Sequence, residues 1–277
     1  MHELKATIFD MDGTLADTED IHRLAFNQAF SEYDFPWQWS VEEYKKLLCI
    51  SGGRERIRNY FQERKIVPEN NEDLCHLAES VHKRKSDVYR EMLVAGHIQL
   101  RQGVKRLFDD AMSKNITLAI ATSSSRKNVE TLLLNALDKN ALSFFPVIVT
   151  SDIVEDKKPS PAVYHLALAK LGLEPQHCVA LEDTYNGNKA AIDAKLKTVI
   201  TTNMYTIDDD FAHASLVVGQ LGENEQPFTV QSGNTFGKRL VDVELLQFIC
   251  NDNSSSQNKS EWSADQAVVA TRRIISS

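Results

Sequence analysis

The chain has 277 residues, 42% of them apolar and 25% charged, which is enough to bury a core domain and a smaller second one. Its 39 acidic residues outnumber its 31 basic ones, and the net charge of −8 disfavours general binding to nucleic acid or to anionic membranes. No run approaches the roughly 18 apolar residues of a spanning helix, no signal peptide precedes the first predicted strand, and the four cysteines are scattered. We therefore expect a cytoplasmic monomer with reduced thiols and with neither nucleic-acid nor membrane partners.

Six short β-branched runs, most of them ending in polar residues, alternate with helical patterns along the chain. They span residues 6–10, 117–122, 146–150, 178–183, 197–201 and 216–219. This alternation predicts an α/β fold, with a Rossmann-like parallel sheet core and helices on both faces. In such a sheet ligands bind beyond the carboxyl ends of the strands, so the polar residues that end these runs are the first candidates for a functional site.

One long interval, residues 18–95, has no strand-like run and instead shows helical patterns over 22–32, 41–48, 54–64 and 72–93. Because it directly follows the first strand, it predicts an inserted helical cap over the strand ends. The expected domains are a core of residues 1–17 and 96–250 and a cap of residues 18–95. Residues 251–277 are mostly polar and of low complexity, which predicts a disordered tail in which 264–275 could form a short helix.

The first predicted strand ends in Asp10-Met11-Asp12-Gly13-Thr14. Alternate residues of an extended chain point the same way, so the carboxylates of Asp10 and Asp12 face one pocket, where their repulsion indicates a hard cation. A calcium loop counted from Asp10 would need Gly and Glu where the chain has Leu15 and Ile21, which excludes that reading. The remaining alternative is an Asp-rich turn without function, which the flanking pattern disfavours.

Three further strand ends and loops carry matching chemistry. Thr122 and Ser123 precede a predicted helix, where hydroxyl and backbone N–H groups can cradle a phosphate, although serines there are often only helix caps. Lys158 precedes a proline and a predicted helix; it is either a solvated charge or the partner of a carboxylate and an incoming phosphate. Glu182 and Asp183 form an acid pair that is costly to bury unmatched, which indicates metal coordination.

The D-x-D-G-T, K-P-x-P and E-D-x-x-x-G motifs, in this order, resemble the haloacid dehalogenase superfamily of phosphotransferases. The resemblance implies that Asp10 is a nucleophile, that Asp12 is an acid/base and that Thr122 binds the transferring phosphate. It also implies that Lys158, or Lys157 as the alternative, balances charge. The implied Mg²⁺ ligands are Asp10, Asp12 through its main-chain carbonyl, Glu182 and Asp183.

The helical insertion resembles the cap of the β-phosphoglucomutase-like branch and, more closely, that of the CbbY-type phosphatases of xylulose-1,5-bisphosphate. One departure is Gln102, where relatives commonly carry a proline that shapes a turn, so the local backbone there can differ. The substrate-binding residues that the resemblance implies are Glu19, His22, Gly52, Gly53, Arg54, Lys85, Ser123 and Asn128.

The cap residues also have a physical reading of their own. Gly52, Gly53 and Arg54 form a flexible loop that opens a helix with a guanidinium, a bidentate grip for phosphate. Lys85 could reach the same group, although a solvated helix face is the plainer reading of its basic neighbourhood. We expect Trp37 and Trp39 to pack within the cap. His22 is left open between a core-facing residue and a substrate contact.

Together these features predict a Mg²⁺-dependent sugar-phosphate phosphatase that works through an aspartyl-phosphate, with xylulose-1,5-bisphosphate as the expected small-molecule partner. A sugar-phosphate mutase, an isomerase, is the alternative, because the same residues can return the phosphate to a sugar instead of to water. A non-catalytic sugar-phosphate sensor is a third reading, which the intact acid pair and Lys158 disfavour.

Overall fold

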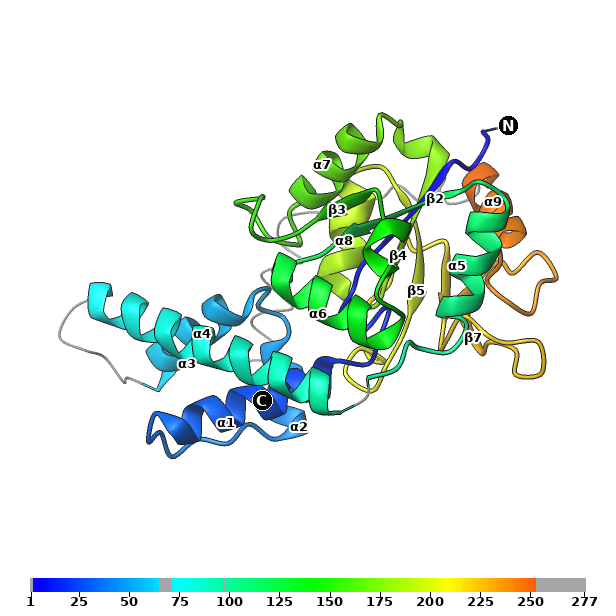
Figure 1. The fold of residues 1–277 in the computed structure, drawn as a ribbon. Helices are drawn as coiled ribbons and strands as arrows, with labels where there is room; N and C mark the ends of the chain where they lie inside the picture. Colours follow the sequence, from blue (N-terminus) through cyan, green and yellow to red (C-terminus); the bar gives the residue numbers. More distant parts are fainter. Residues whose placement is uncertain (1, 65–70, 97, 253–277) are drawn as a thin grey trace.

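The computed structural model describes residues 2–64, 71–96 and 98–252 (Figure 1). Its centre is a seven-stranded sheet in the order β3-β2-β1-β4-β5-β6-β7. The strands are β1 (Ala6–Phe9), β2 (Thr117–Ala121), β3 (Val147–Val149), β4 (Cys178–Glu182), β5 (Lys197–Thr201), β6 (Leu216–Val218) and β7 (Val230–Gly233). Every neighbouring pair is parallel except β6–β7. The predicted Rossmann-like core is therefore confirmed.

Strand β7 is the element that the sequence reading missed. It pairs antiparallel with β6, and all four of its residues are exposed. An edge strand of Val-Gln-Ser-Gly buries no apolar face, so it has neither the alternation nor the apolar run by which a strand is recognised in sequence. The sheet is thus mostly, and not wholly, parallel.

Helices cover both faces of the sheet, and the strands supply apolar residues to each in turn. Ile8 of β1 packs in one buried cluster with α7 (Ala162–Leu171) and α8 (Tyr185–Asp193). Its neighbour Phe9 packs in the other with α5 (Val104–Ser113), α6 (Arg126–Ala136) and α9 (Val243–Asn251). Successive side chains of a strand point to opposite faces, so this alternation sets the two helical layers seen in Figure 1.

Four helices form the cap, which lies to one side of the sheet in Figure 1: α1 (Glu19–Glu32), α2 (Val41–Leu47), α3 (Gly53–Glu63) and α4 (Asn71–Ala95). They agree with the four predicted helices to within about three residues at each end. The cap has its own apolar cluster, in which Trp39 is fully buried with its ring 4.8 Å from that of Phe30, while Trp37 packs against the edge. The expected packing role of both tryptophans is confirmed.

The chain enters and leaves the cap through two adjacent segments. Ala16 pairs with Leu100, and the Arg101 backbone N–H donates to the Leu15 carbonyl at 2.8 Å. The Arg101 guanidinium then binds four backbone carbonyls, those of Gly13, Thr201, Thr202 and Gly219. This anchorage leaves the cap above the carboxyl ends of the central strands.

Gln102, where the resemblance predicted a difference in the local backbone, continues this junction. Its carbonyl accepts from the Leu221 N–H at 3.2 Å, and its side-chain amide donates to Gln226 Oε1 at 2.9 Å. The segment is therefore held by hydrogen bonds in place of a proline ring.

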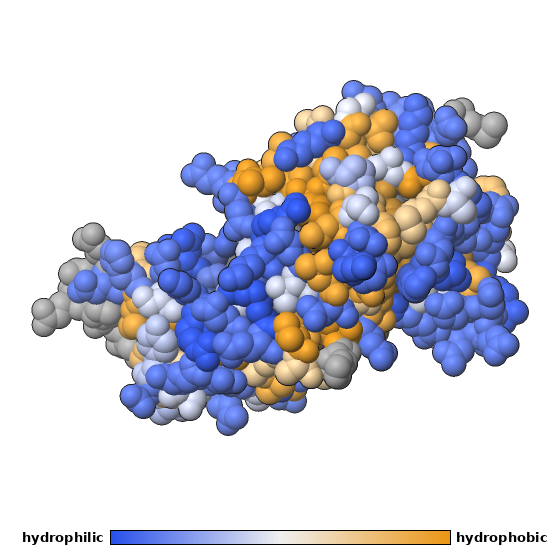
Figure 2. Space-filling model, viewed as in Figure 1, coloured by the Kyte–Doolittle hydropathy of each residue, from blue (hydrophilic) through white to orange (hydrophobic). Residues whose placement is uncertain are grey.

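Hydrophilic residues dominate the outer surface of the cap in the view of Figure 2, whereas hydrophobic residues gather over the sheet core. None of the described helices is long and apolar enough to cross a membrane. All four cysteines fall within the described residues and are free thiols. Asn251 is the last residue of α9, so most of the predicted tail, including 264–275, lies outside the described residues.

Candidate active site

A cavity of about 230 Å³ lies between the cap and the carboxyl ends of β1, β2 and β4. Both layers contribute to its lining, as the fold dictates for a cap that follows the first strand. Of the predicted site residues, those that line it are Asp10, Asp12, Glu19, His22, Gly52, Gly53, Lys85, Thr122, Ser123, Asn128, Lys158 and Asp183. The two that are not part of the lining are Arg54 and Glu182.

Lys158 joins two carboxylates at the floor of the cavity. Its Nζ donates to Asp10 Oδ1 at 2.6 Å and to Glu182 Oε1 at 2.5 Å, and the Tyr164 hydroxyl donates to the same Glu182 oxygen at 2.5 Å. Burial alone would lower the pKa of Lys158, but the two carboxylates raise it above its ordinary value. The lysine is therefore a permanent buried cation beside Asp10.

Asp183 lies beside Asp10 and Glu182, but its described hydrogen-bond partners are neutral groups and not the Lys158 ammonium. Its Oδ2 accepts from the Asn203 amide at 2.8 Å, and Thr14 Oγ1 lies 3.5 Å from its Oδ1. Burial, with the charges of Asp10 and Glu182, raises the pKa of Asp183 well above its usual range. A Cβ on Gly13 would come within 1.9 Å of Asp183 Oδ2, so only glycine fits here, in a backbone with φ of +80°.

Asp10, Glu182 and Asp183 place one oxygen each within 4.8 Å of one another. Three buried carboxylates face the one ammonium of Lys158, which leaves negative charge uncompensated. Oxygen donors with excess negative charge suit a hard divalent cation, which would also reverse the raised pKa values. The residues present therefore fit the predicted metal. Glu182, engaged by Lys158 and Tyr164, is the least free of the three to serve as a direct ligand.

Asp12 sits in a different environment, on the cap side of the cavity. Its Oδ1 accepts from the hydroxyls of Thr18 at 2.6 Å and Tyr89 at 3.0 Å, and lies 3.1 Å from His22 Nε2. Burial acts to raise the pKa of Asp12, but His22 and the hydroxyls of Thr18 and Ser124 hold it below its usual range. The two carboxylates, two residues apart in the chain, thus differ in protonation behaviour: burial raises the pKa of Asp10, whereas that of Asp12 is lowered.

A cap lysine completes this side. Lys85 Nζ lies 2.6 Å from His22 Nδ1 and 4.5 Å from the centre of the Phe26 ring. A charged Lys85 can only donate, so His22 accepts at Nδ1 and carries its proton at Nε2, toward Asp12. Burial, then the nearby Arg56 charge, lowers the pKa of Lys85 to about 7. His22 therefore links Lys85 of the cap to Asp12 of the core and is not a member of the described apolar cluster of the cap.

The loop after β2 places hydroxyl groups along the cavity. Ser125 caps α6 by accepting from the Asn128 N–H, and the Ser124 N–H donates to Thr122 Oγ1 at 3.0 Å. The Asn128 side chain accepts from Arg90 of the cap at 3.0 Å. Hydroxyl groups and the N-terminus of α6, a helix of 11 residues, therefore face the cavity, an arrangement that suits an anion.

The space beside Gly52 and Gly53 of the cap is occupied by side chains from two other segments. A Cβ on Gly52 would lie 2.5 Å from Lys157 Nζ, and one on Gly53 would lie 2.7 Å from His82 Nε2. Arg54, by contrast, is 53% exposed, and its guanidinium pairs with Glu55 at 3.2 Å. In this arrangement Lys157 and His82, not Arg54, are the nitrogen-bearing side chains next to the loop.

Several lining residues were not part of the sequence prediction. Among them are Tyr44, Arg56, His82, Ser124, Lys157 and Asn186. Arg56 spends its donors on the carbonyls of Leu47 and Ile50 and on the Tyr44 hydroxyl, so it holds the loop in shape. Spacing on α4 is the signal that could have found His82. It lies three residues before Lys85, and residues three apart share one face of a helix.

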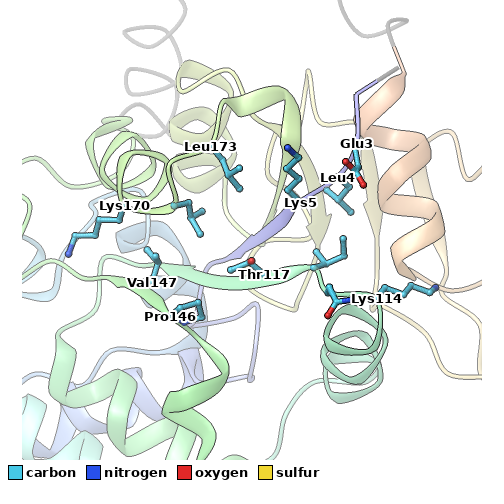
Figure 3. Close-up of a pocket in the computed structure, with 12 residues that line it drawn as sticks. Glu3, Leu4, Lys5, Lys114, Thr117, Pro146, Val147, Lys170 and Leu173 are labelled. Carbon is cyan, nitrogen blue, oxygen red and sulfur yellow. The ribbon is translucent and has the colours of Figure 1, made fainter.

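A second, more open depression of about 630 Å³ lies at the opposite, amino ends of β1 and β2 (Figure 3). Lys5, Lys114 and Lys170 stand around it with exposed side chains. It contains none of the predicted site residues.

Comparison with known proteins agrees with this geometry. The family model of haloacid dehalogenase-like hydrolases matches residues 7–201. Protein CbbY of Rhodobacter capsulatus is 42% identical over 212 residues, which cover 76% of this chain and 91% of that protein. The chain belongs to the haloacid dehalogenase-like hydrolases. As a member of this family it is a phosphatase-type hydrolase, as the motifs predicted, and the CbbY resemblance is confirmed.

Two further relatives are described by a bound sugar bisphosphate or by an activity on phosphorylated carbohydrates. The crystal structure of a CbbY variant from Rhodobacter sphaeroides in complex with xylulose-1,5-bisphosphate matches with a TM-score of 0.72 and 36% identity, covering 78% of this chain and 94% of that one. A phosphorylated carbohydrates phosphatase of Thermotoga maritima is 30% identical over 197 residues, covering 71% of this chain and 84% of that protein.

Proposed function

We propose that this hydrolase removes a phosphate from a sugar phosphate, with Mg²⁺ as cofactor, Asp10 as nucleophile and xylulose-1,5-bisphosphate as substrate. The observation that carries the proposal is the pairing of Asp10 with the permanent cation of Lys158 beneath a cavity whose cap side carries further cations. The xylulose-1,5-bisphosphate bound in the similar CbbY structure supports the choice of sugar.

The chemistry proceeds in two steps, phosphorylation of Asp10 and hydrolysis of the aspartyl-phosphate. An Asp10 carboxylate oxygen attacks phosphorus, the bond from phosphorus to the sugar oxygen breaks, and a proton from Asp12 goes to that oxygen. Asp12 then takes a proton from water, whose oxygen attacks phosphorus and releases phosphate and free Asp10. Lys158 and Thr122 stabilise charge on the phosphoryl oxygens, and Mg²⁺, held by Asp10, Asp183, the Asp12 carbonyl and Glu182 as the fourth predicted ligand, would add Lewis-acid stabilisation.

The lowered pKa of Asp12 suits the second step directly, because it keeps Asp12 ionised as a base. For the first step its pKa must rise, and an anionic phosphate entering beside it has that effect. Substrate binding therefore prepares the acid that the first step uses.

A mutase remains the second candidate, since the His22–Lys85 link places cap groups next to the acid/base and could equally exclude water. Phosphate release from xylulose-1,5-bisphosphate with no bisphosphate primer present tests the choice. Stoichiometric release of inorganic phosphate supports the phosphatase, and conversion to an isomer without release supports the mutase.

The cap cations predict a preference for two phosphates. We expect kcat/KM for xylulose-1,5-bisphosphate to exceed that for xylulose 5-phosphate, and Arg54→Ala and Lys85→Met each to reduce it about 10- to 150-fold, the worth of one charge-assisted hydrogen bond. Hydrolysis of a small aryl phosphate, which has no distal group, should change little in Arg54→Ala. Steady-state kinetics on the three substrates measure this.

The matched control is Arg58→Ala, an exposed arginine on the same helix α3. Its kinetics should equal those of wild type. Equal losses on all three substrates in Arg54→Ala would show that Arg54 supports the fold, and unchanged kinetics would place the distal phosphate at Lys157 and His82 instead.

Lys85 also predicts proton uptake on binding. Its pKa of about 7 in the free enzyme should rise when a phosphate dianion lies nearby, so above pH 7 the complex holds more protons than the free protein. Calorimetry of xylulose-1,5-bisphosphate binding to Asp10→Asn, at about pH 7.5 in buffers of different ionisation enthalpy, measures the uptake. We expect an uptake that the added substitution Lys85→Met removes; the same uptake in both proteins would contradict the assignment.

A further inference from the structure

A short turn that follows β5, residues 203–206, belongs to the core but contacts the cap. It also contacts the group of Asp10, Glu182 and Asp183, called the acidic cluster below. It starts two residues after the strand ends at Thr201, and its Thr206 is 2% exposed. Neither its asparagine nor its tyrosine lines the cavity, so neither has a part in the chemistry described above.

Asn203 is held by three hydrogen bonds, two from its side chain and one from its backbone N–H. Its Nδ2 donates to Asp183 Oδ2 at 2.8 Å, and its Oδ1 accepts from the Tyr205 N–H at 2.9 Å. Its own N–H donates to Thr206 Oγ1 at 3.1 Å. Asn203 therefore cannot turn away from Asp183 without breaking the hydrogen bond that shapes the turn at Tyr205.

Tyr205 extends from the same turn into the cap. Its side chain is 3% exposed and is the one residue that the core contributes to the described apolar cluster of the cap. Its ring meets Tyr44 edge-on with centroids 5.7 Å apart, and its hydroxyl donates to Asp20 Oδ1 at 2.6 Å. Tyr44 in turn donates to Glu19, which lines the cavity.

We propose that this turn couples the metal site to the cap: Tyr205 seats the cap over the cavity, and Asn203, held in the same turn, aligns Asp183, so that cation binding and cap closure strengthen each other. The inference rests on the proposed Mg²⁺ site and goes beyond it by making Tyr205 and Asn203 positioning residues. Coupling of this kind is reciprocal: a change that loosens the cap must weaken cation binding by the same factor by which the cation strengthens closure.

The other hydrogen bonds described between the cap and the core near the cavity do not reach the apolar cluster of the cap. Lys157 reaches Glu55 at 2.6 Å, next to Lys158 on Asp10 and Glu182, and Asn186 reaches Ser51 at 3.1 Å. Tyr89 and His22 reach Asp12. Arg90 reaches Asn128 in the phosphate cradle, again away from Asp183. Only at the turn does one rigid segment contact both a carboxylate of the acidic cluster and the apolar interior of the cap.

Calorimetric titration of Mg²⁺ into the full-length protein tests the coupling without any turnover. Tyr205→Phe keeps the ring in the cap and removes only the hydroxyl, which touches no member of the acidic cluster. We expect the Mg²⁺ dissociation constant to rise about three- to tenfold, part of the 10-fold or more that one hydrogen bond to a charged group can contribute. Tyr33→Phe, at an exposed cap tyrosine, is the control and should leave the constant unchanged.

Asp20→Ala removes the acceptor of the same hydrogen bond from the cap side and should reproduce the effect, and the double variant should lose no more than either single one. In kinetics at saturating Mg²⁺, Tyr205→Phe should lower kcat/KM for the sugar bisphosphate, whose reaction needs cap closure, and leave the aryl phosphate nearly unchanged. A Mg²⁺ affinity of Tyr205→Phe equal to wild type overturns the coupling. If wild type itself binds no Mg²⁺, the proposed metal site fails, and the coupling with it.

Discussion

Asp10→Asn is expected to lose phosphate release by more than about 10⁴-fold, the scale of removing a covalent nucleophile. The amide has the shape of the carboxylate but no anionic oxygen to attack phosphorus. Lys158 retains Glu182 as its partner, so the buried ammonium stays paired. Phosphate release measured with Mg²⁺ and a sugar bisphosphate in excess gives the result.

The same substitution should not cost stability. Burial, only partly offset by Lys158, raises the pKa of Asp10 well above its usual range, which means that its charge is unfavourable in the folded protein without a cation. The melting temperature of Asp10→Asn without Mg²⁺ should therefore equal or exceed that of wild type. Asp138→Asn, on the exposed surface, is the control for both measurements. Residual turnover within about tenfold of wild type would falsify the covalent route.

Asp12→Asn is expected to slow turnover of a sugar phosphate by about 10²- to 10⁴-fold, because both steps lose their proton donor or acceptor. An aryl phosphate separates the two steps. Its leaving group needs no protonation, so Asp10 should still be phosphorylated while release by water stalls. We expect a burst of close to one equivalent of phenol per enzyme, followed by a slow phase.

Rapid-mixing absorbance of the released phenol, with acid-quench detection of the phosphoenzyme, measures that burst. Wild type should show no burst of comparable size, because Asp12 is already ionised and in place for the second step. Asp12→Asn with a slow, linear release of phenol would mean that Asp12 acts in the first step alone or positions the substrate.

Local chemistry explains why the core of the site could be predicted. Asp10 follows β1, Thr122 follows β2, and Glu182 and Asp183 lie at the end of β4. The carboxyl ends of adjacent parallel strands meet at one edge of a sheet, so the recognition of apolar runs already implies that these residues gather there. The fold class and the cap helices followed for the same reason, since periodicity is a property of neighbouring residues.

The cap side of the site was less determined by sequence. Gly52 and Gly53 lie in the cavity as expected, yet Arg54, beside them in the chain, points to Glu55, while Lys157 from a distant loop fills the space. Which residue of a helical turn faces a cavity depends on how the helix rotates against its neighbours, and packing sets that rotation.

The sequence by itself determined the six parallel strands, the helices of the cap, and the acidic, hydroxyl and lysine groups near the strand ends. Only the tertiary structure decided that Tyr164 holds Glu182 against Lys158, and that Asn203 and Tyr205 tie Asp183 to the cap. Such contacts join residues up to 185 positions apart, as between Asp20 and Tyr205. They have no local pattern, because they exist only once the packing of the whole chain brings the two partners together.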